Sequence, residues 1–170
     1  MITPETRRVV VTDTCVLINL IHVERLRLLG ALPGYEFVIP EHVYEEVTDQ
    51  EQRQALDEAL GQGSLKKEHI TDLTSIELYA SLRGVLGSGE AACIAMAVTQ
   101  GWMIASDEGR LFRREAIARI GEDRLLTTVR LYVMAINAGV ITIEEADRDK
   151  VLLESCKFKV SFTSFRELVG

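Results

Sequence analysis

The amino-acid sequence predicts an α/β protein whose central sheet is mainly parallel. Three short apolar runs, partly β-branched, predict strands at residues 8–12, 36–39 and 102–106. Long segments with the periodicity of helices separate these runs. Strands that alternate with helices are typical of parallel sheets, because each crossover helix returns the chain to the edge where the next strand begins.

Helix signals place the remaining elements in order along the chain. The first helix is expected after Asp13, at 15–29, and the second after Pro40, which suits an early helical position, at 41–60. A third helix, at 78–83, follows Thr74 and Glu77 at capping-box spacing, and Gly84 ends it. A fourth helix, at 90–100, opens after a Gly-Ser-Gly turn.

The second half of the chain is predicted to be mostly helical. After the strand at 102–106 we expect a helix at 109–120, a short edge strand at 125–127 and a helix at 128–138. Thr142 and Glu145 have capping-box spacing and open a helix that ends near Cys156, and Ser164 with Glu167 begins a last turn. Helical elements therefore occupy about 128–170.

Length and composition indicate one acidic domain, residues 1–170. The chain has 170 residues, and 19 Lys and Arg against 26 Asp and Glu give a formal charge of −7. Its 47% apolar and 26% charged residues are ordinary globular composition, which excludes disordered and fibrous classes. No run of about 18 uncharged apolar residues occurs, and the N-terminus lacks a signal-peptide pattern. We therefore expect a cytoplasmic protein without a membrane span.

Cysteine and histidine give no zinc pattern. The three cysteines, Cys15, Cys93 and Cys156, are odd in number and far apart, which favours reduced thiols over a disulfide framework. No two cysteines or histidines share the short spacings of a zinc site. Any bound metal is therefore expected to have oxygen ligands.

Two aspartates follow predicted strands. Asp13 ends the run VVVTD, and Asp107 ends the run WMIASD. Ligands of open parallel sheets bind beyond the carboxyl ends of the strands, so both carboxylates are expected at one site. An alternative remains for each residue, because Asp13 could simply cap the following helix and Asp107 could belong to a turn with Glu108 and Gly109.

Two glutamates lie on or beside apolar helix faces. At about 100° per residue, Ile94 and Ala97 fall within about 60° of Glu90, so its carboxylate leaves an apolar stripe and needs a hydrogen bond, an ion pair or a metal. Glu46 lies about 60° from Val43, whereas Glu45 points nearly opposite. Alternatively, Glu90 faces water in the first turn and Glu46 is a solvated edge residue.

A cluster of these acids predicts metal-assisted hydrolysis. Crowded carboxylates stay ionised only beside cations, and carboxylate ligands without Cys or His suit Mg²⁺ or Mn²⁺. Such ions activate water for phosphodiester hydrolysis. Phosphate-binding loops of nucleotide-binding proteins are absent. A haloacid-dehalogenase-type phosphatase would need an acid where this chain has Cys15, and a receiver domain would need paired acids at the first strand.

Four segments resemble the PIN-domain ribonucleases, close to the VapC-like toxins of type II toxin–antitoxin systems. They are VVTDTCVLI, IPEHVYEEV, LGSGEAACIAMA and WMIASDEGR, and the match spans roughly 9–114. The resemblance implies a PIN-like three-layer α/β/α sandwich and a Mg²⁺- or Mn²⁺-dependent endoribonuclease that hydrolyses RNA. For a toxin it also implies a cognate antitoxin and a homodimer.

The resemblance also implies site residues. It makes Asp13 the first-strand acid, Glu46 the second-motif acid, Glu90 the helix acid and Asp107 the last-strand acid, and these four are the expected catalytic residues. Asp13, Glu90 and Asp107 are also expected to bind the metal. Glu108 occupies a position where the family often has a second aspartate, and is a further candidate metal ligand. The chain also departs from the family at Cys15, where Ser or Asn frequently follows the Asp-Thr pair.

Substrate binding must overcome the negative charge of the chain, which repels RNA. Arg110 and Arg114 are four residues apart on one predicted helical face and are candidates for binding substrate phosphates. Thr14 is a candidate donor to a phosphate or a carboxylate. The alternative is a solvated helix face with salt bridges to Glu108 and Glu115. The competing function is a PIN-fold RNA-binding or protein-interaction module that does not cleave.

Overall fold

A computed structural model describes residues 6–170, so residues 1–5 of the predicted domain lie outside the described part. Its sheet has five strands in the order β3-β2-β1-β4-β5. They are β1 (Arg8–Thr12), β2 (Tyr35–Pro40), β3 (Lys66–Glu68), β4 (Met103–Ala105) and β5 (Leu125–Leu126). Every neighbouring pair is parallel. The predicted α/β class is confirmed, and the sheet is parallel throughout.

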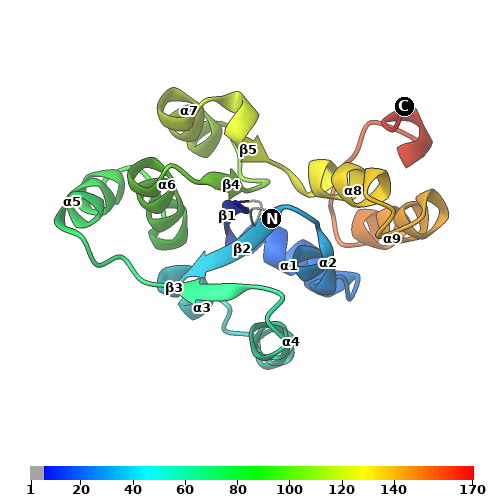
Figure 1. The fold of residues 1–170 in the computed structure, drawn as a ribbon, viewed down its shortest axis with the longest axis horizontal. Helices are drawn as coiled ribbons and strands as arrows, with labels where there is room; N and C mark the ends of the chain where they lie inside the picture. The colour runs from blue at the N-terminus through cyan, green and yellow to red at the C-terminus, as the bar shows by residue number, and fades with distance from the viewer. Residues whose placement is uncertain (1–5) are drawn as a thin grey trace, which may run out of the picture.

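Helices cover both faces of this sheet (Figure 1). They are α1 (Thr14–His22), α2 (Arg27–Ala31), α3 (Glu41–Glu46), α4 (Gln50–Gly61), α5 (Leu73–Leu82), α6 (Ser88–Gln100), α7 (Arg110–Ile120), α8 (Thr128–Asn137) and α9 (Ile143–Ser155). The 3₁₀ turns are η1 (Glu122–Arg124) and η2 (Phe165–Glu167). Figure 1 shows α5, α6 and α7 on one side of the sheet and α1, α2, α8 and α9 on the other. The three-layer α/β/α sandwich is confirmed. Among residues 6–170, no helix combines the length and apolarity that crossing a membrane requires.

The centre of the core lies between β1 and α6. Val10 and Val11 of β1 are fully buried, and α6 is buried from Gly89 to Ala97, apart from the half-buried Glu90. The helix contacts β1, β2 and β4. Because many of its buried side chains are alanines, α6 packs closely against the sheet. Its first turn is thereby held at the carboxyl ends of the strands.

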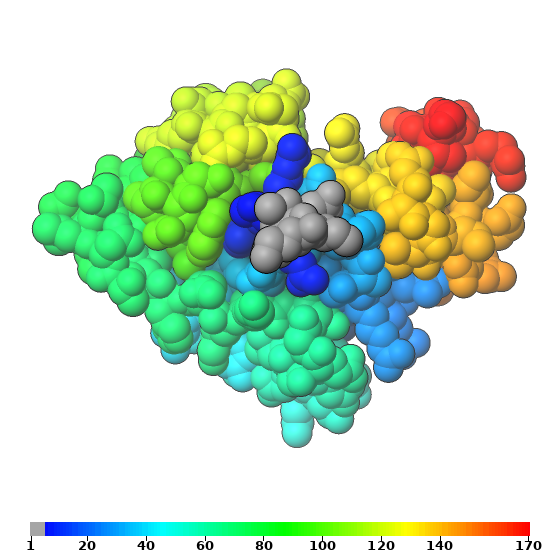
Figure 2. Space-filling model, in the orientation of Figure 1, coloured from blue at the N-terminus to red at the C-terminus, as the bar shows by residue number. Residues whose placement is uncertain are grey.

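The C-terminal segment is attached through a buried aromatic side chain. Phe165 is buried and stacks on Tyr132 of α8, with ring centroids 5.3 Å apart. Asp147 of α9 accepts hydrogen bonds from the Ser164 hydroxyl and the Phe165 amide, at 2.6 and 2.8 Å. Figure 2 shows this segment at one end of the long axis of the molecule and α5 at the other.

Two predicted helices are interrupted in the structure. The helix expected at 15–29 divides into α1 and α2, and between them Glu24 adopts a positive φ of 55°, which a helix does not tolerate. The helix expected at 41–60 divides into α3 and α4, because the Asp49 side chain accepts a hydrogen bond from the amide of Gln52 and starts a new helix.

Two further details differ from the sequence prediction. Strand β3 was not predicted, since its Lys-Lys-Glu sequence lacks apolar alternation. Helix α5 begins after Asp72, which caps the amide of Ser75, and the predicted cap at Thr74 is wrong. The capping boxes predicted at Thr142 and at Ser164 are confirmed.

The two ends of the parallel strands are unlike. Asp13 follows β1 and Ser106 follows β4, so both lie at the carboxyl ends of the strands, which we call the carboxyl edge of the sheet. At the opposite edge, Gly34 precedes β2 and Gly101 precedes β4, with φ of 82° and 72°. Glycine suits both turns, because other residues rarely adopt this left-handed conformation.

Candidate metal centre

Asp13 lies at the centre of the carboxyl edge. It ends β1 and caps α1, with its Oδ1 accepting a 2.8 Å hydrogen bond from the amide of Thr14. Its Oδ2 accepts a 3.2 Å bond from the hydroxyl of Ser106. Asp13 is 1% exposed, and burial raises its pKa to about 7; the Thr14 amide opposes this shift, while Glu108, Glu46 and Glu90 add to it. A cation beside Asp13 would favour the ionised carboxylate.

Glu108 and Cys15 share this position with Asp13. One carboxylate oxygen each from Asp13 and Glu108 and the sulfur of Cys15 all lie within 4.8 Å of one another. Burial raises the pKa of Glu108, and Glu90 and Glu46 raise it further. Burial also raises the pKa of the Cys15 thiol, as does Asp13. The donor set therefore combines crowded carboxylates with a thiol that is neutral without a cation.

Glu90 reaches the site from the first turn of α6. Its Oε1 accepts a 3.3 Å hydrogen bond from the amide of Gly87, the residue that precedes the helix. It is half-buried, and its charge raises the pKa of both Asp13 and Glu108. Glu90 therefore faces the acid cluster and also stabilises the helix start.

Glu46 reaches the same cluster from the end of α3. Its Oε1 accepts a 2.7 Å hydrogen bond from the amide of Gly89, and its Oε2 accepts a 2.6 Å bond from the hydroxyl of Thr14. These contacts place Glu46 between the starts of α6 and α1. The helix dipole of α6 favours a negative charge at this point.

Asp107 is oriented differently from the other predicted acids. Its Oδ1 accepts a 2.9 Å hydrogen bond from the Thr128 amide, and its Oδ2 accepts bonds from the Asn19 amide group, at 2.9 Å, and from the Thr128 hydroxyl. Its own amide donates to the sulfur of Cys15 at 3.2 Å. Asp107 thus joins the end of β4 to α1 and α8, while the adjacent Glu108 approaches Asp13.

Comparison with known proteins identifies the family. A family model described as DUF3368, a PIN domain, matches residues 9–154. The chain belongs to the PIN-domain family. This protein is also similar to a chain in the crystal structure of VapBC2 from Rickettsia felis bound to a DNA fragment from their promoter. The two chains have 16% sequence identity and a TM-score of 0.47, and the match covers 70% of this chain and 96% of that chain. None of the curated proteins matches significantly.

Three site residues of this PIN domain escaped the sequence prediction. Ser106, which bonds Asp13, is 3% exposed, and its burial after an apolar strand is the signal that could have revealed it. Asn19 is the amide residue inside the apolar segment TCVLINLIH of α1, which is an unusual place for a polar side chain. Thr128 was predicted only as a helix start, and nothing local indicates its bonds to Asp107.

Of the predicted substrate-binding residues, Thr14 contacts one of the acids, and Arg110 and Arg114 are exposed on α7. The Thr14 hydroxyl bonds to Glu46, so it supports a carboxylate. Arg110 begins α7 two residues after Glu108 and is exposed. Arg114 is exposed and pairs with Glu115 at 3.4 Å, whereas Arg113 pairs with Glu122 at 3.3 Å. Arg110 and Arg114 therefore remain accessible to a ligand.

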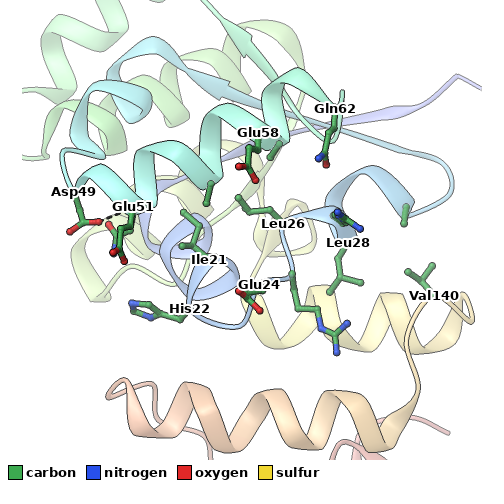
Figure 3. A pocket seen from close by; sticks show the side chains of 16 residues that line it. Ile21, His22, Glu24, Leu26, Leu28, Asp49, Glu51, Glu58, Gln62 and Val140 are labelled. Carbon is green, nitrogen blue, oxygen red and sulfur yellow. Dashed lines mark hydrogen bonds between the residues drawn. The ribbon is translucent and has the colours of Figure 1, made fainter.

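A separate groove of about 930 Å³ lies between the α1–α2 turn and α4 of the PIN domain. Figure 3 shows acidic side chains entering it from both sides, among them Glu24 and Glu58. Its lining also includes Arg25 and Arg27. None of the predicted site acids lines this groove, so it is distinct from the candidate metal centre.

Proposed function

We propose that this PIN domain is a metal-dependent endoribonuclease that hydrolyses phosphodiester bonds of RNA. The observation that carries the proposal is the placement of Asp13 and Glu108 within ligand reach of each other. Glu46 and Glu90 surround them and raise the pKa of both carboxyl groups. Carboxylates crowded in this way are stable in ionised form beside a divalent cation, and Mg²⁺ or Mn²⁺ suits oxygen ligands.

The proposal gives each acid a role. Asp13, Glu90 and Glu108 hold the ion, and Glu46 completes the negative pocket through Gly89 and Thr14. Asp107 is assigned a positioning role, because its carboxylate accepts three hydrogen bonds from Asn19 and Thr128. A bound Mg²⁺ or Mn²⁺ supplies positive charge to the attacked phosphate and lowers the pKa of a water nucleophile.

Two exposed arginines that follow Glu108 in the chain support binding of a polyanion. Arg110 follows Glu108 by two positions, and Arg114 lies one turn further along α7. We propose that their guanidinium groups bind the phosphates that flank the cleaved bond, since guanidinium matches phosphate geometry. They would offset part of the repulsion that the charge of −7 imposes on RNA.

A cleavage assay with matched variants tests this function. Purified protein is incubated with mixed RNA and Mn²⁺ or Mg²⁺, using wild type, Asp13→Asn and Glu90→Gln. Glu45→Gln is the control, because Glu45 is exposed and adjacent to Glu46. We expect cleavage by wild type and the control, and none by the two site variants or with chelator. Cleavage that survives both site substitutions would refute the proposal.

The second candidate is a PIN-fold module that binds RNA or protein without cleaving. The groove beside α4 favours a protein-binding version of this candidate, because it offers a charged surface away from the acids. The same assay separates the two functions. A module would retain RNA in a mobility shift and leave it intact with either ion.

The family resemblance further leads us to propose a toxin with a cognate antitoxin, acting as a homodimer, and a single domain over 1–170. The burial of Phe165 supports including the C-terminal segment in the domain. Two measurements test these points. The adjoining reading frame is expected to encode a short DNA-binding protein, and light scattering is expected to give twice the mass of 19.0 kDa. A monomeric mass would contradict the homodimer.

A further inference from the structure

We propose that the thiol of Cys15 is a ligand at the candidate metal centre and makes this centre favour ions with an affinity for sulfur. The inference rests on the proposed function, because it concerns the same metal centre. It adds a sulfur donor to a set that the sequence predicts to consist of oxygen alone. The consequence is that Co²⁺ and Zn²⁺ bind more tightly, relative to Mg²⁺, than they would at a centre with oxygen ligands alone.

The position of the sulfur fits coordination. The Cys15 sulfur lies 3.7 Å from Oδ2 of Asp13. It also lies within 4.8 Å of a carboxylate oxygen of Glu108. With metal–sulfur bonds of about 2.3 Å and metal–oxygen bonds of about 2.1 Å, two ligands of one ion are separated by about 3 to 4 Å. Only a small movement of Glu108 would bring all three donors onto one ion.

Two groups that follow β4 hold the Cys15 sulfur close to Asp13 and Glu108. The amide of Asp107 donates a hydrogen bond to it at 3.2 Å, and the hydroxyl of Ser106 lies 3.6 Å away. Both residues follow β4, so the end of this strand holds the thiol and Glu108 in one place. Cys15 is half-buried, which distinguishes it from Cys93, buried within α6, and from Cys156, exposed after α9.

Donor chemistry gives the expected preference. When the thiol coordinates, the proton of its S–H group passes to solvent and the sulfur lone pair forms the bond to the ion. Thiolate is a soft donor that stabilises Co²⁺ and Zn²⁺ far more than Mg²⁺. A serine at this position would offer a hard oxygen and remove the part of the difference that the sulfur contributes.

Titration with Co²⁺, followed by absorption spectroscopy, tests the assignment. Co²⁺ bound by thiolate gives a sulfur-to-cobalt charge-transfer band in the near ultraviolet. We expect the band in wild type and in the control Cys156→Ser, and its loss in Cys15→Ser. Co²⁺ affinity should fall at least about tenfold in Cys15→Ser, the lower limit of what even an outer-shell partner contributes. Mg²⁺ affinity, measured by competition, should stay the same.

A second variant keeps the test independent of how Cys15 substitutions fold. In Cys93→Ala/Cys156→Ser, Cys15 is the remaining cysteine of the chain, so a charge-transfer band there identifies its sulfur. Co²⁺ binding without the band, or a band that persists in folded Cys15→Ser, would overturn the sulfur ligand and leave the proposed nuclease intact. Failure of both Co²⁺ and Mg²⁺ to bind would overturn the metal centre and the inference together.

Discussion

The amide of Gly89 donates a 2.7 Å hydrogen bond to Oε1 of Glu46 and thereby joins the first turn of α6 to the end of α3. A Cβ atom at position 89 would lie 2.7 Å from both carboxylate oxygens of Glu46. Such a separation is shorter than van der Waals distance. The absence of a side chain at Gly89 therefore allows this carboxylate to approach the helix start.

Replacing Gly89 by alanine should displace Glu46 and reduce RNA cleavage. A displacement of about 1 Å can cost up to about 100-fold in rate. Folding stability should change little, because alanine favours helix and the Glu46 side chain can rotate away. Gly61→Ala is the control, since a Cβ there meets nothing within 4 Å. Single-turnover cleavage and thermal unfolding provide the measurements, and full activity of Gly89→Ala would contradict the role of Gly89.

Without metal, the protein should become less stable as pH rises towards neutrality. Asp13 has a pKa of about 7 in the folded chain and about 3.9 when unfolded, so the folded state binds the proton more tightly between these values. Its stabilising contribution is complete below about pH 4 and is lost as pH rises through about 7. Each unit by which the two pKa values differ corresponds to about 1.4 kcal/mol of unfolding free energy.

Urea unfolding with chelator between pH 4 and 8 measures this dependence, with Asp13→Asn as the reference. The difference in slope between the two proteins isolates Asp13 from other titrating groups. Above pH 7, Mn²⁺ should stabilise wild type and leave Asp13→Asn nearly unchanged, because ligands bound to the folded state raise stability. Equal slopes for both proteins would show that Asp13 is not the titrating group.

Substitution of Asp107 and of its neighbour Glu108 should have different effects on stability. Asp107→Ala removes the acceptor for Thr128 and Asn19, so we expect a loss of about 1–3 kcal/mol in unfolding free energy. Glu108→Gln relieves crowding with Asp13 and should leave stability unchanged or higher, while weakening Mn²⁺ binding. Urea unfolding and metal titration give both quantities. Equal stability of the two variants would contradict the positioning role of Asp107.

Removal of Arg110 and Arg114 should weaken RNA binding in a salt-dependent way. For single-stranded RNA, each phosphate that is no longer neutralised by an arginine reduces the slope of log affinity against log salt by about 0.7. Arg113→Ala is the matched control, because Arg113 lies on the same helix and pairs with Glu122. Binding is measured with the inactive Asp13→Asn protein, so that RNA stays intact. An unchanged slope in the double variant would dismiss the binding of phosphates by these two side chains.

Local sequence patterns predicted much of the fold. Strand β1 and the cap at Asp13 were predictable, because an apolar run and a capping residue act on their own neighbours. Strand β3 was not, because its charged residues form a strand only by pairing with β2 at the sheet edge. The breaks after α1 and α3 were missed because apolar periodicity continues across them, although the Asp49 cap was a readable signal.

Within the candidate site, prediction succeeded where helix geometry determines a side-chain direction. Glu46 was preferred to Glu45 from its angle to Val43, and its contacts with Gly89 and Thr14 agree with that preference. The orientations of Asp107 and Glu108 were not predictable. The orientation of Asp107 depends on Asn19, which is 88 positions away in the chain, and such contacts arise only when distant elements pack.

The difference between the two ends of the parallel strands offers a practical route to single-molecule work. The turn before β4, at Gly101, lies at the amino edge, and the neighbouring Gln100 is exposed. In a Cys156→Ser background, which removes the exposed native thiol, biotin attached through Gln100→Cys would immobilise the protein by the side remote from Asp13. The acids would then face free solution, where nucleic acid can reach them without obstruction from the support.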